Sequence, residues 1–256
     1  MYGIVPSGPP DCKRGIEMMK PLLSPSFKKE PNIQEYIIYE DSHILLCHKP
    51  AGMAVQTRQT SQTDLEHIIK NYLAKNMSPR DSTPYLAVIN RLDQPVEGLI
   101  LFAKTKEAAT SLSRQLTGHT LTKEYLAITS SIPQKEAAIL KNYLKKDSKQ
   151  NKSSVVPVST PDGKPASLSY VLEETNGTYG LLHIELHTGR HHQIRAQLSH
   201  INAPLLGDEK YGGVPEEHLC LCSLKLAFVH PSTKEEVSFV TTPRNPLFKK
   251  LFPDVS

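Results

Sequence analysis

An acidic residue lies on a polar turn between two apolar runs. Residues 85–89 and 99–103 are rich in aliphatic and aromatic side chains and are short enough to be buried strands. Asp93 lies on the connection between them, where a rigid scaffold commonly positions catalytic groups and where a carboxylate avoids the cost of burial inside a strand. The alternative for Asp93 taken alone is that its side chain only closes the turn beside Pro95 and Gly98.

Two further segments contain side chains that could act with this carboxylate. One follows an apolar strand and includes Arg190, His191, His192, Gln193 and Arg195. The other reads Lys-Glu-Tyr-Leu-Ala at residues 123–127, near the start of a strand. A guanidinium suits an ionised carboxylate in a dry pocket, because it stays charged and offers a planar set of donors. The ring of Tyr125 offers an aromatic face, and stacking of such a ring on a nucleic-acid base contributes about 1–3 kcal/mol to binding.

Together with the Arg-Leu-Asp turn at residues 91–93, these segments resemble those of the RluA-type pseudouridine synthases, which isomerise uridine within RNA. The resemblance extends from about residue 36 to residue 248. It includes the segment 41–52, which contains Lys-Pro-Ala-Gly, the Gly-Asp-Glu-Lys-Tyr-Gly-Gly segment at 207–213 and Leu-Ala-Phe-Val-His-Pro at 226–231. Several motifs in one order are far more specific than any single motif.

The resemblance implies a role for each matching residue. Asp93 would be the essential aspartate, Arg195 its charged partner and Tyr125 the aromatic ring against the target base. Whether the aspartate attacks the base, attacks the sugar or removes a sugar proton stays open. Arg190 is a competitor for the pairing role, although a surface or phosphate contact suits it better. The reaction needs no cofactor, because it involves no redox step and no net hydrolysis.

The same resemblance implies an RNA-contacting set. A uridine within structured RNA must be flipped out before its glycosidic bond can be reached, and Arg91 would fill the gap that it leaves. The chain has Asn90 where the family usually has histidine, and asparagine cannot become a cation. The expected RNA-binding residues are Arg91, Asn90, Arg190, His192 and Gln193, with His192 also able to organise the Asp93 loop.

The hydrophobic pattern predicts an α+β domain with a largely antiparallel mixed sheet and flanking helices. A Thr63-x-x-Glu66 capping box predicts one helix, Thr105 and Gly118 bound a second, and residues 192–200 suggest a third. Besides the two strands around Asp93, strands are expected at residues 36–39, 44–47, 124–130, 168–173, 180–187, 219–228 and 236–240.

The domain organisation has two parts. Residues 1–33 are proline-rich and basic, which predicts a flexible extension, and residues 34–256 form the catalytic domain. Formal net charge is +4, which permits a polyanionic partner without demanding one. A lysine cluster in a polar stretch near residue 149 could also contact phosphates, although solvated loops of this kind are common.

The remaining expectations concern environment and cofactors. The four cysteines lack metal-clip spacing, and His183 and His187 fall on a strand where they are too far apart to chelate easily, so no metal is expected. No apolar run reaches the roughly 20 residues of a membrane helix. We therefore expect a cytoplasmic protein with RNA, ribosomal or transfer, as its partner and no membrane contact. A monomer would suffice for the site.

Two other functions are compatible with some of these residues. A catalytically silent RNA-binding protein of the same fold would account for Asn90 but not for the retention of Asp93, Tyr125 and Arg195. A glycoside-cleaving hydrolase would use Asp93 and Glu97 as its two carboxylates. That alternative leaves the tyrosine and arginine segments unexplained.

Overall fold

A single eleven-stranded sheet forms the centre of the molecule in the computed structural model, which describes residues 32–57, 63–75 and 83–255. The helical elements are η1 (Ile33–Glu35), α1 (Leu65–Lys75), α2 (Lys106–Thr117), α3 (Gln193–His200), η2 (Glu209–Tyr211) and α4 (Pro246–Leu251). The strands are β1 (Ile37–Glu40), β2 (Ile44–Lys49), β3 (Ala87–Val88), β4 (Glu97–Ala103), β5 (Thr122–Thr129), β6 (Ala137–Asp147), β7 (Lys152–Val156), β8 (Lys164–Thr175), β9 (Gly180–Leu186), β10 (Leu221–Val229) and β11 (Glu236–Val240).

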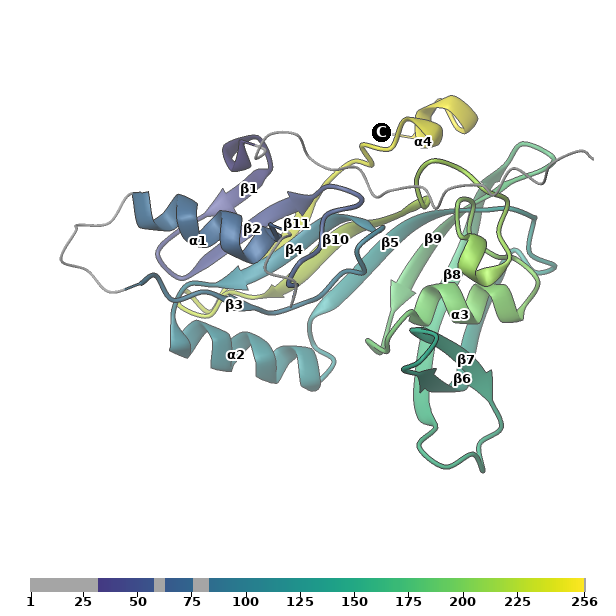
Figure 1. Ribbon diagram of the computed structural model, residues 1–256, viewed down its shortest axis with the longest axis horizontal. Helices are drawn as coiled ribbons and strands as arrows, with labels where there is room; N and C mark the ends of the chain where they lie inside the picture. The colour runs from purple at the N-terminus through teal and green to yellow at the C-terminus, as the bar shows by residue number, and fades with distance from the viewer. Residues whose placement is uncertain (1–31, 58–62, 76–82, 256) are drawn as a thin grey trace, which may run out of the picture.

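The sheet is almost entirely antiparallel, as expected for an α+β domain. Its order is β1-β2-β4-β10-β5-β9-β8-β6-β7, with β11 on β10 and β3 on β4 (Figure 1). Among the described strand pairs, only β4 and β10 run parallel. This pair joins the N-terminal strands to the C-terminal strands at the middle of the sheet.

Helices cover both faces of the N-terminal strands. Alternate residues of β2 point to opposite faces, so Leu45 packs with α1 while Ile44 packs with α2. Every residue of β2 and β4 is buried as a result. Figure 1 shows α1 and α2 on opposite sides of these strands. This double cover explains why both strands read as continuous apolar runs in the sequence.

Strand β5 has the same arrangement in the C-terminal half. Tyr125 and Ala127 pack on the face that carries α3, whereas Leu126 and Ile128 pack with α4 on the other face. Leu92, from the turn between β3 and β4, belongs to the same cluster as Tyr125 and α3. The alternation along β5 therefore brings the Asp93 turn, the tyrosine and α3 to one face of the sheet.

Several predicted boundaries were wrong. The strand at 85–89 is only the short β3, and Asp64, not Thr63, accepts the backbone N–H of His67 at the start of α1, at 2.9 Å. The β6–β7 hairpin was missed, although half of its strand residues are apolar, and of these apolar side chains only Leu144 is fully buried. Helix α4 was missed too, although Asn245 caps it and proline occupies its first turn.

One residue of the predicted extension lies in the core. Ile33 is only 7% exposed and packs in the core beside α1, so the folded domain includes it. Residues 1–31 of the predicted extension, which include Cys12, lie outside the described residues. None of the helices in the described part of the chain is long and apolar enough to span a membrane.

Gly98 sits at the parallel contact between β4 and β10, and we predict that it accepts no side chain. Its φ of +112° is unfavourable for other residues, and an added Cβ would lie 2.4 Å from the backbone oxygen of Ser223. Gly98→Ala should lower the free energy of unfolding by at least about 3 kcal/mol in urea titrations.

Gly177→Ala is the matched control for this prediction. Gly177 also has a positive φ, +88°, but an added Cβ there meets nothing within 4 Å. It should cost about 1 kcal/mol, the strain of the backbone alone. If Gly98→Ala and Gly177→Ala lower the free energy of unfolding equally, the close approach of β4 and β10 does not constrain Gly98.

Candidate active site

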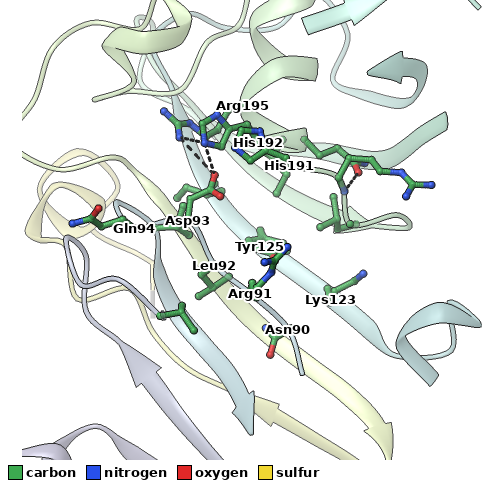
Figure 2. A pocket seen from close by; sticks show the side chains of 18 of the residues that line it. Asn90, Arg91, Leu92, Asp93, Gln94, Lys123, Tyr125, His191, His192 and Arg195 are labelled. Carbon is green, nitrogen blue, oxygen red and sulfur yellow. Dashed lines mark hydrogen bonds and ion pairs between the residues drawn. The ribbon is translucent and has the colours of Figure 1, made fainter. Parts of the chain in front are cut away.

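A cleft of about 1120 Å³ opens on the face of β5 that carries α3. Asp93, Tyr125 and Arg195 all line it, although they come from a turn, a strand and a helix that are far apart in the sequence. Figure 2 shows the Asp93 carboxylate pointing toward Arg195 and His192. The side chain of Asp93 is 29% exposed, so it is largely withdrawn from solvent yet still reachable from the cleft.

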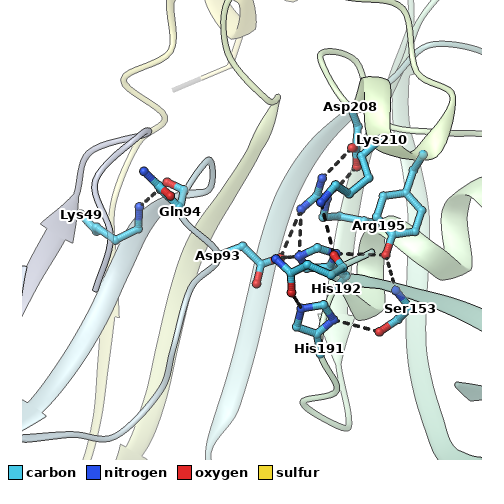
Figure 3. A network of polar contacts seen from close by, with 11 residues as sticks. Lys49, Asp93, Gln94, Ser153, His191, His192, Arg195, Asp208 and Lys210 are labelled. Carbon is cyan, nitrogen blue, oxygen red and sulfur yellow. Dashed lines mark hydrogen bonds and ion pairs between the residues drawn. The ribbon is translucent and has the colours of Figure 1, made fainter. Parts of the chain in front are cut away.

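Arg195 is the centre of the charged contacts. It donates two hydrogen bonds to Asp208, from Nε at 2.8 Å and from Nη2 at 2.7 Å. The remaining nitrogen, Nη1, lies 3.6 Å from Oδ2 of Asp93 (Figure 3). Asp208 and Arg195 are both almost fully buried, with side chains 1% and 8% exposed. The fork-like pair with Asp208 therefore fixes the guanidinium, which presents its free edge to Asp93.

His192 acts as a neutral acceptor beside this guanidinium. Arg195 can only donate, so its contact of 3.2 Å with Nε2 of His192 requires that nitrogen to carry no proton. Nδ1–H then donates to the hydroxyl of Tyr211 at 3.0 Å. Burial, together with the positive charge of Arg195, lowers the pKa of His192 to about 3. The approach of Nε2 to Asp93, 3.5 Å, is consequently not an ion pair at neutral pH.

Tyr211 connects the site to the β6–β7 hairpin. Its hydroxyl also accepts the backbone N–H of Ser153 at 2.8 Å, and the Arg195 guanidinium lies over its ring at 5.0 Å. His191 stacks on His192 with ring centroids 3.8 Å apart and contacts the hydroxyl of Ser153 at 2.9 Å. The hairpin, which the sequence suggested was a polar loop, therefore contacts the site residues through Ser153 and lines the cleft with Lys146.

A tightly folded loop carries Asp208 and Tyr211 into the site. It wraps so closely that a Cβ added at Gly213 would lie 1.9 Å from the backbone oxygen of Leu205. Gly213 N–H donates to the Asp208 backbone oxygen at 2.9 Å, and Tyr211 N–H donates to the same oxygen at 3.0 Å. The Gly-Asp-Glu-Lys-Tyr-Gly-Gly segment thus supplies the buried partner of Arg195, a role that its sequence alone did not reveal.

Lys49 holds the other side of the Asp93 turn. It is fully buried, and its ammonium donates to the backbone oxygens of Pro50, Met53 and Gln94, at 2.9, 2.8 and 3.0 Å. Three acceptors match its three N–H groups and favour the charged form. Burial lowers the pKa of Lys49 to about 7, an effect that the Asp93 charge opposes. Lys49 therefore ties the Lys-Pro-Ala-Gly turn to the residue after the aspartate.

The charges around Asp93 oppose one another. Burial raises the pKa of its carboxyl above the ordinary value, whereas the positive charges of Arg195 and Lys49 lower it. The negative charge of Asp208 adds to the upward shift. Asp208 thus has two effects: it orients Arg195, and it also neutralises part of the charge that Arg195 offers to Asp93.

The structure places the other predicted residues as follows. Tyr125 is 6% exposed on the floor of the cleft, and burial raises the pKa of its hydroxyl, which therefore stays protonated. Arg91 is exposed and borders the cleft. Arg190 is also an exposed lining residue, and its Nε donates to the Pro165 backbone oxygen at 3.0 Å. Asp93 is therefore paired with Arg195, not with Arg190.

Two of the expected RNA-binding residues have structural contacts instead. Gln193 is 3% exposed, and its amide bonds Thr188 and the backbone of Arg190 and Ser167. Asn90 is 5% exposed, and its amide donates to Leu99 O and accepts from Leu101 N on β4. Both residues line the cleft, and their side chains are buried and bonded within the protein.

The second carboxylate of the hydrolase alternative lies outside the site. Glu97 is 2% exposed and accepts the backbone N–H groups of Arg244 and Asn245, both at 3.1 Å. It does not line the cleft. The expectation that Asp93 and Glu97 could face one substrate was therefore wrong, because Glu97 begins β4 and turns toward the C-terminal segment.

The histidines considered as metal ligands are bound to carboxylates. His183 contacts Glu124 at 2.9 Å and Glu173 at 3.1 Å from its two ring nitrogens. The described part of the chain contains no cluster of three or more histidine, cysteine or acidic side chains that could hold a metal ion. The three described cysteines are buried free thiols.

The fold matches solved structures of one class. The human RNA Pseudouridylate Synthase Domain Containing 4 superposes with a TM-score of 0.69 at 22% identity, over 83% of this chain and 90% of that one. Human RNA Pseudouridylate Synthase Domain Containing 1 also gives a TM-score of 0.69, at 21% identity, over 89% of this chain and 91% of that one. The chain therefore has the pseudouridine synthase fold.

Sequence comparison then identifies the family. The RNA pseudouridylate synthase family model matches residues 43–200. Ribosomal large subunit pseudouridine synthase C of Escherichia coli is 31% identical over 238 residues, 87% of this chain and 70% of that protein. Ribosomal large subunit pseudouridine synthase D of Haemophilus influenzae is 35% identical over 184 residues, 72% of this chain but only 55% of that protein. The chain belongs to the RNA pseudouridylate synthase family.

The Arg195–Asp208 pair gives a prediction about stability. Arg195→Met leaves the buried Asp208 carboxylate without a partner and should lower the free energy of unfolding by about 3–5 kcal/mol. Arg195→Met combined with Asp208→Leu removes both buried charges and should cost less than the single change. Urea unfolding of the wild type and the two variants measures this, and a double variant that is less stable than Arg195→Met would contradict the assigned pairing.

His192 gives a prediction about acid stability. The ordinary pKa of histidine in an unfolded chain is about 6.5, whereas that of folded His192 is about 3. Below pH of about 6.5 the unfolded state binds more protons, so stability present at neutral pH is lost as the pH falls toward 3. His192→Asn, which suits the left-handed backbone there (φ 51°), should lose less stability between neutral pH and pH of about 4.5. An unchanged acid loss would argue against a neutral, buried imidazole.

Proposed function

We propose that this protein isomerises specific uridines in ribosomal RNA to pseudouridine, with Asp93 as the essential residue. The observation that carries the proposal is the pairing of an accessible carboxylate with a buried guanidinium, 3.6 Å apart, beside the ring of Tyr125. Family membership makes this chemistry the best-supported use of such a site. The reaction breaks the bond from N1 to the sugar and joins C5 to the same sugar carbon.

The proposed chemistry gives each residue one task. Arg195 and Lys49 stabilise the ionised form of Asp93 against burial, so that it can act as a nucleophile or a base. Tyr125 holds the uracil ring by stacking while the detached base turns, because an aromatic face permits rotation without much loss of contact. Arg91, exposed at the rim, fills the gap left in the RNA by the flipped uridine.

The choice of ribosomal RNA rests on the relatives. The curated relatives named above are ribosomal large subunit pseudouridine synthases. This chain spans only 55% of the Haemophilus influenzae protein, so the RNA target is proposed by similarity. Transfer RNA remains the other candidate within the family's range. The basic residues around the cleft suit either RNA.

The alternatives lose support from the same contacts. A silent RNA binder has no need for a carboxylate in its binding cleft, because a negative charge weakens RNA binding. A two-carboxylate hydrolase lacks its second acid in the cleft, since Glu97 is buried against the C-terminal segment. Asn90, the departure from the usual histidine, bonds β4 and leaves the Asp93 turn in place.

Asp93→Asn tests the proposal directly. Pseudouridine formation releases the hydrogen on C5, so tritium from C5-labelled large-subunit ribosomal RNA reports turnover. The wild type should release tritium and yield pseudouridine nucleoside, whereas Asp93→Asn should be slower by more than about 10³-fold. RNA binding by the variant should be as tight as wild type or tighter, because a negative charge is lost.

Chromatography of the digested RNA separates the three possible functions. Pseudouridine as the product, with no free uracil, is the result that the proposal requires. Free uracil and an abasic sugar would establish a hydrolase. Tight binding of the RNA by the wild type without any product would establish the silent binder.

A further inference from the structure

The cleft contains a buried cation without a partner. Lys123 of β5 is 5% exposed and lines the cleft. Within residues 32–57, 63–75 and 83–255, no hydrogen bond or ion pair holds its ammonium group. Nζ lies beside Gly189, 3.8 Å from the position that an added Cβ would take. Figure 2 shows the side chain extending along the cleft from β5.

Such a lysine is costly to keep in a folded protein. Burial of an unpaired ammonium is unfavourable, and burial lowers the pKa of Lys123 accordingly. Lys49 shows the usual solution, because three backbone oxygens surround its buried ammonium. Lys123 has no such acceptors in the described chain, and a bound ligand with negative charge could supply them.

The position of Lys123 relative to Tyr125 indicates which part of a ligand it meets. The two residues are separated by one position on β5, so their side chains share a face of the sheet about 6–7 Å apart. Figure 2 places Lys123 on the far side of Tyr125 from Asp93. An RNA strand that runs along the cleft, with one nucleotide held between Asp93 and Tyr125, would bring the backbone phosphate of a neighbouring nucleotide to Lys123.

The surroundings of Lys123 favour an anion. The cleft lining also includes Arg91, Lys146 and Arg190, and Asp93 is its one acidic residue among those described. Gly189 adds no side chain in front of the ammonium, so a phosphate can approach it. Burial within the cleft would make a direct ion pair there stronger than one on the surface.

We propose that Lys123 binds a backbone phosphate of the RNA next to the uridine that stacks on Tyr125. This inference rests on the proposed function, because it assumes that an RNA strand enters this cleft. Lys123 would then hold the strand in register with Asp93, so that only the nucleotide on Tyr125 faces the carboxylate. A contact with a carbonyl oxygen of the uracil is the competing interpretation.

The test uses Lys123→Met, which keeps the alkyl chain, and Lys123→Arg, which keeps the charge. Lys106→Met is the matched control, because Lys106 is an exposed lysine at the start of α2 and does not line the cleft. Binding to a large-subunit ribosomal RNA transcript is measured over a range of KCl concentrations, and tritium release is measured at saturating RNA. Thermal unfolding is recorded for each variant.

A phosphate contact makes specific predictions. Lys123→Met should bind the transcript about tenfold more weakly, and the slope of log affinity against log salt should fall by about 1. Its Tm should equal or exceed that of wild type, because an unpaired buried charge is lost. Lys123→Arg should restore the slope, and Lys106→Met should leave affinity and slope close to those of wild type.

Other outcomes would overturn the inference or separate it from the proposed function. If Lys123→Met leaves the salt slope unchanged but slows the rate at saturating RNA, Lys123 contacts the uracil base and not a phosphate. If the slope is unchanged and the Tm is lower, Lys123 stabilises the fold and not bound RNA. If the slope changes as expected but the wild type releases no tritium, the phosphate contact stands and the proposed reaction fails. If the wild type does not bind the transcript, both fail.

Discussion

The site depends on one buried arginine shared between two carboxylates. Asp208 binds Arg195 by two short hydrogen bonds, and this leaves one edge of the guanidinium for Asp93. A guanidinium bonded only to Asp93 could move together with that side chain. Because Asp208 holds the Arg195 guanidinium in place, the guanidinium instead defines the position of the Asp93 carboxylate. His192 contributes an acceptor and no charge, so the positive field at Asp93 comes from Arg195 and Lys49.

The sheet brings the three parts of the site together. The parallel pairing of β4 with β10 places the turn before β4 beside β5, and the alternation of β5 directs Tyr125 to the face that α3 covers. Helix α3 begins at His192, whose left-handed backbone (φ 51°) lets the chain turn sharply from the 187–190 segment into the helix. Gln193 bonds that segment from within, which explains its burial. Loops thus carry Asp93 and Asp208, and packed strands and helices position both.

The sequence was most informative where a residue type has few alternative uses. Buried double-covered strands, the Arg-Leu-Asp turn and the Arg195 segment could be predicted, because apolar periodicity and ordered motifs report on them directly. Asp208 and Tyr211 could not, since their partners are 13 and 19 residues away and only the fold of the glycine-containing loop brings them close. The β6–β7 hairpin was missed for a related reason: its contacts with Tyr211 and His191 are long-range, and of its apolar side chains only Leu144 is fully buried.

The same limit applies to the two buried lysines. Lys49 and Lys123 are polar residues within apolar strands. The sequence alone does not distinguish a lysine that donates to backbone oxygens from one whose ammonium group is available to a ligand. The surroundings distinguish them: Lys49 is saturated by carbonyls, and Lys123 faces the cleft without an acceptor. Burial therefore accompanies a structural role at Lys49 and, as we propose, a ligand-binding role at Lys123.

Pseudouridine mapping of total cellular RNA tests the central claim most directly. A strain that lacks this protein is complemented with the wild type or with Asp93→Asn, and carbodiimide labelling with reverse transcription locates each pseudouridine. Our account predicts that at least one ribosomal RNA site disappears in the deletion, returns with the wild type and stays absent with Asp93→Asn. Restoration of the site by Asp93→Asn, or a map unchanged by the deletion while the purified protein also makes no pseudouridine, would contradict it.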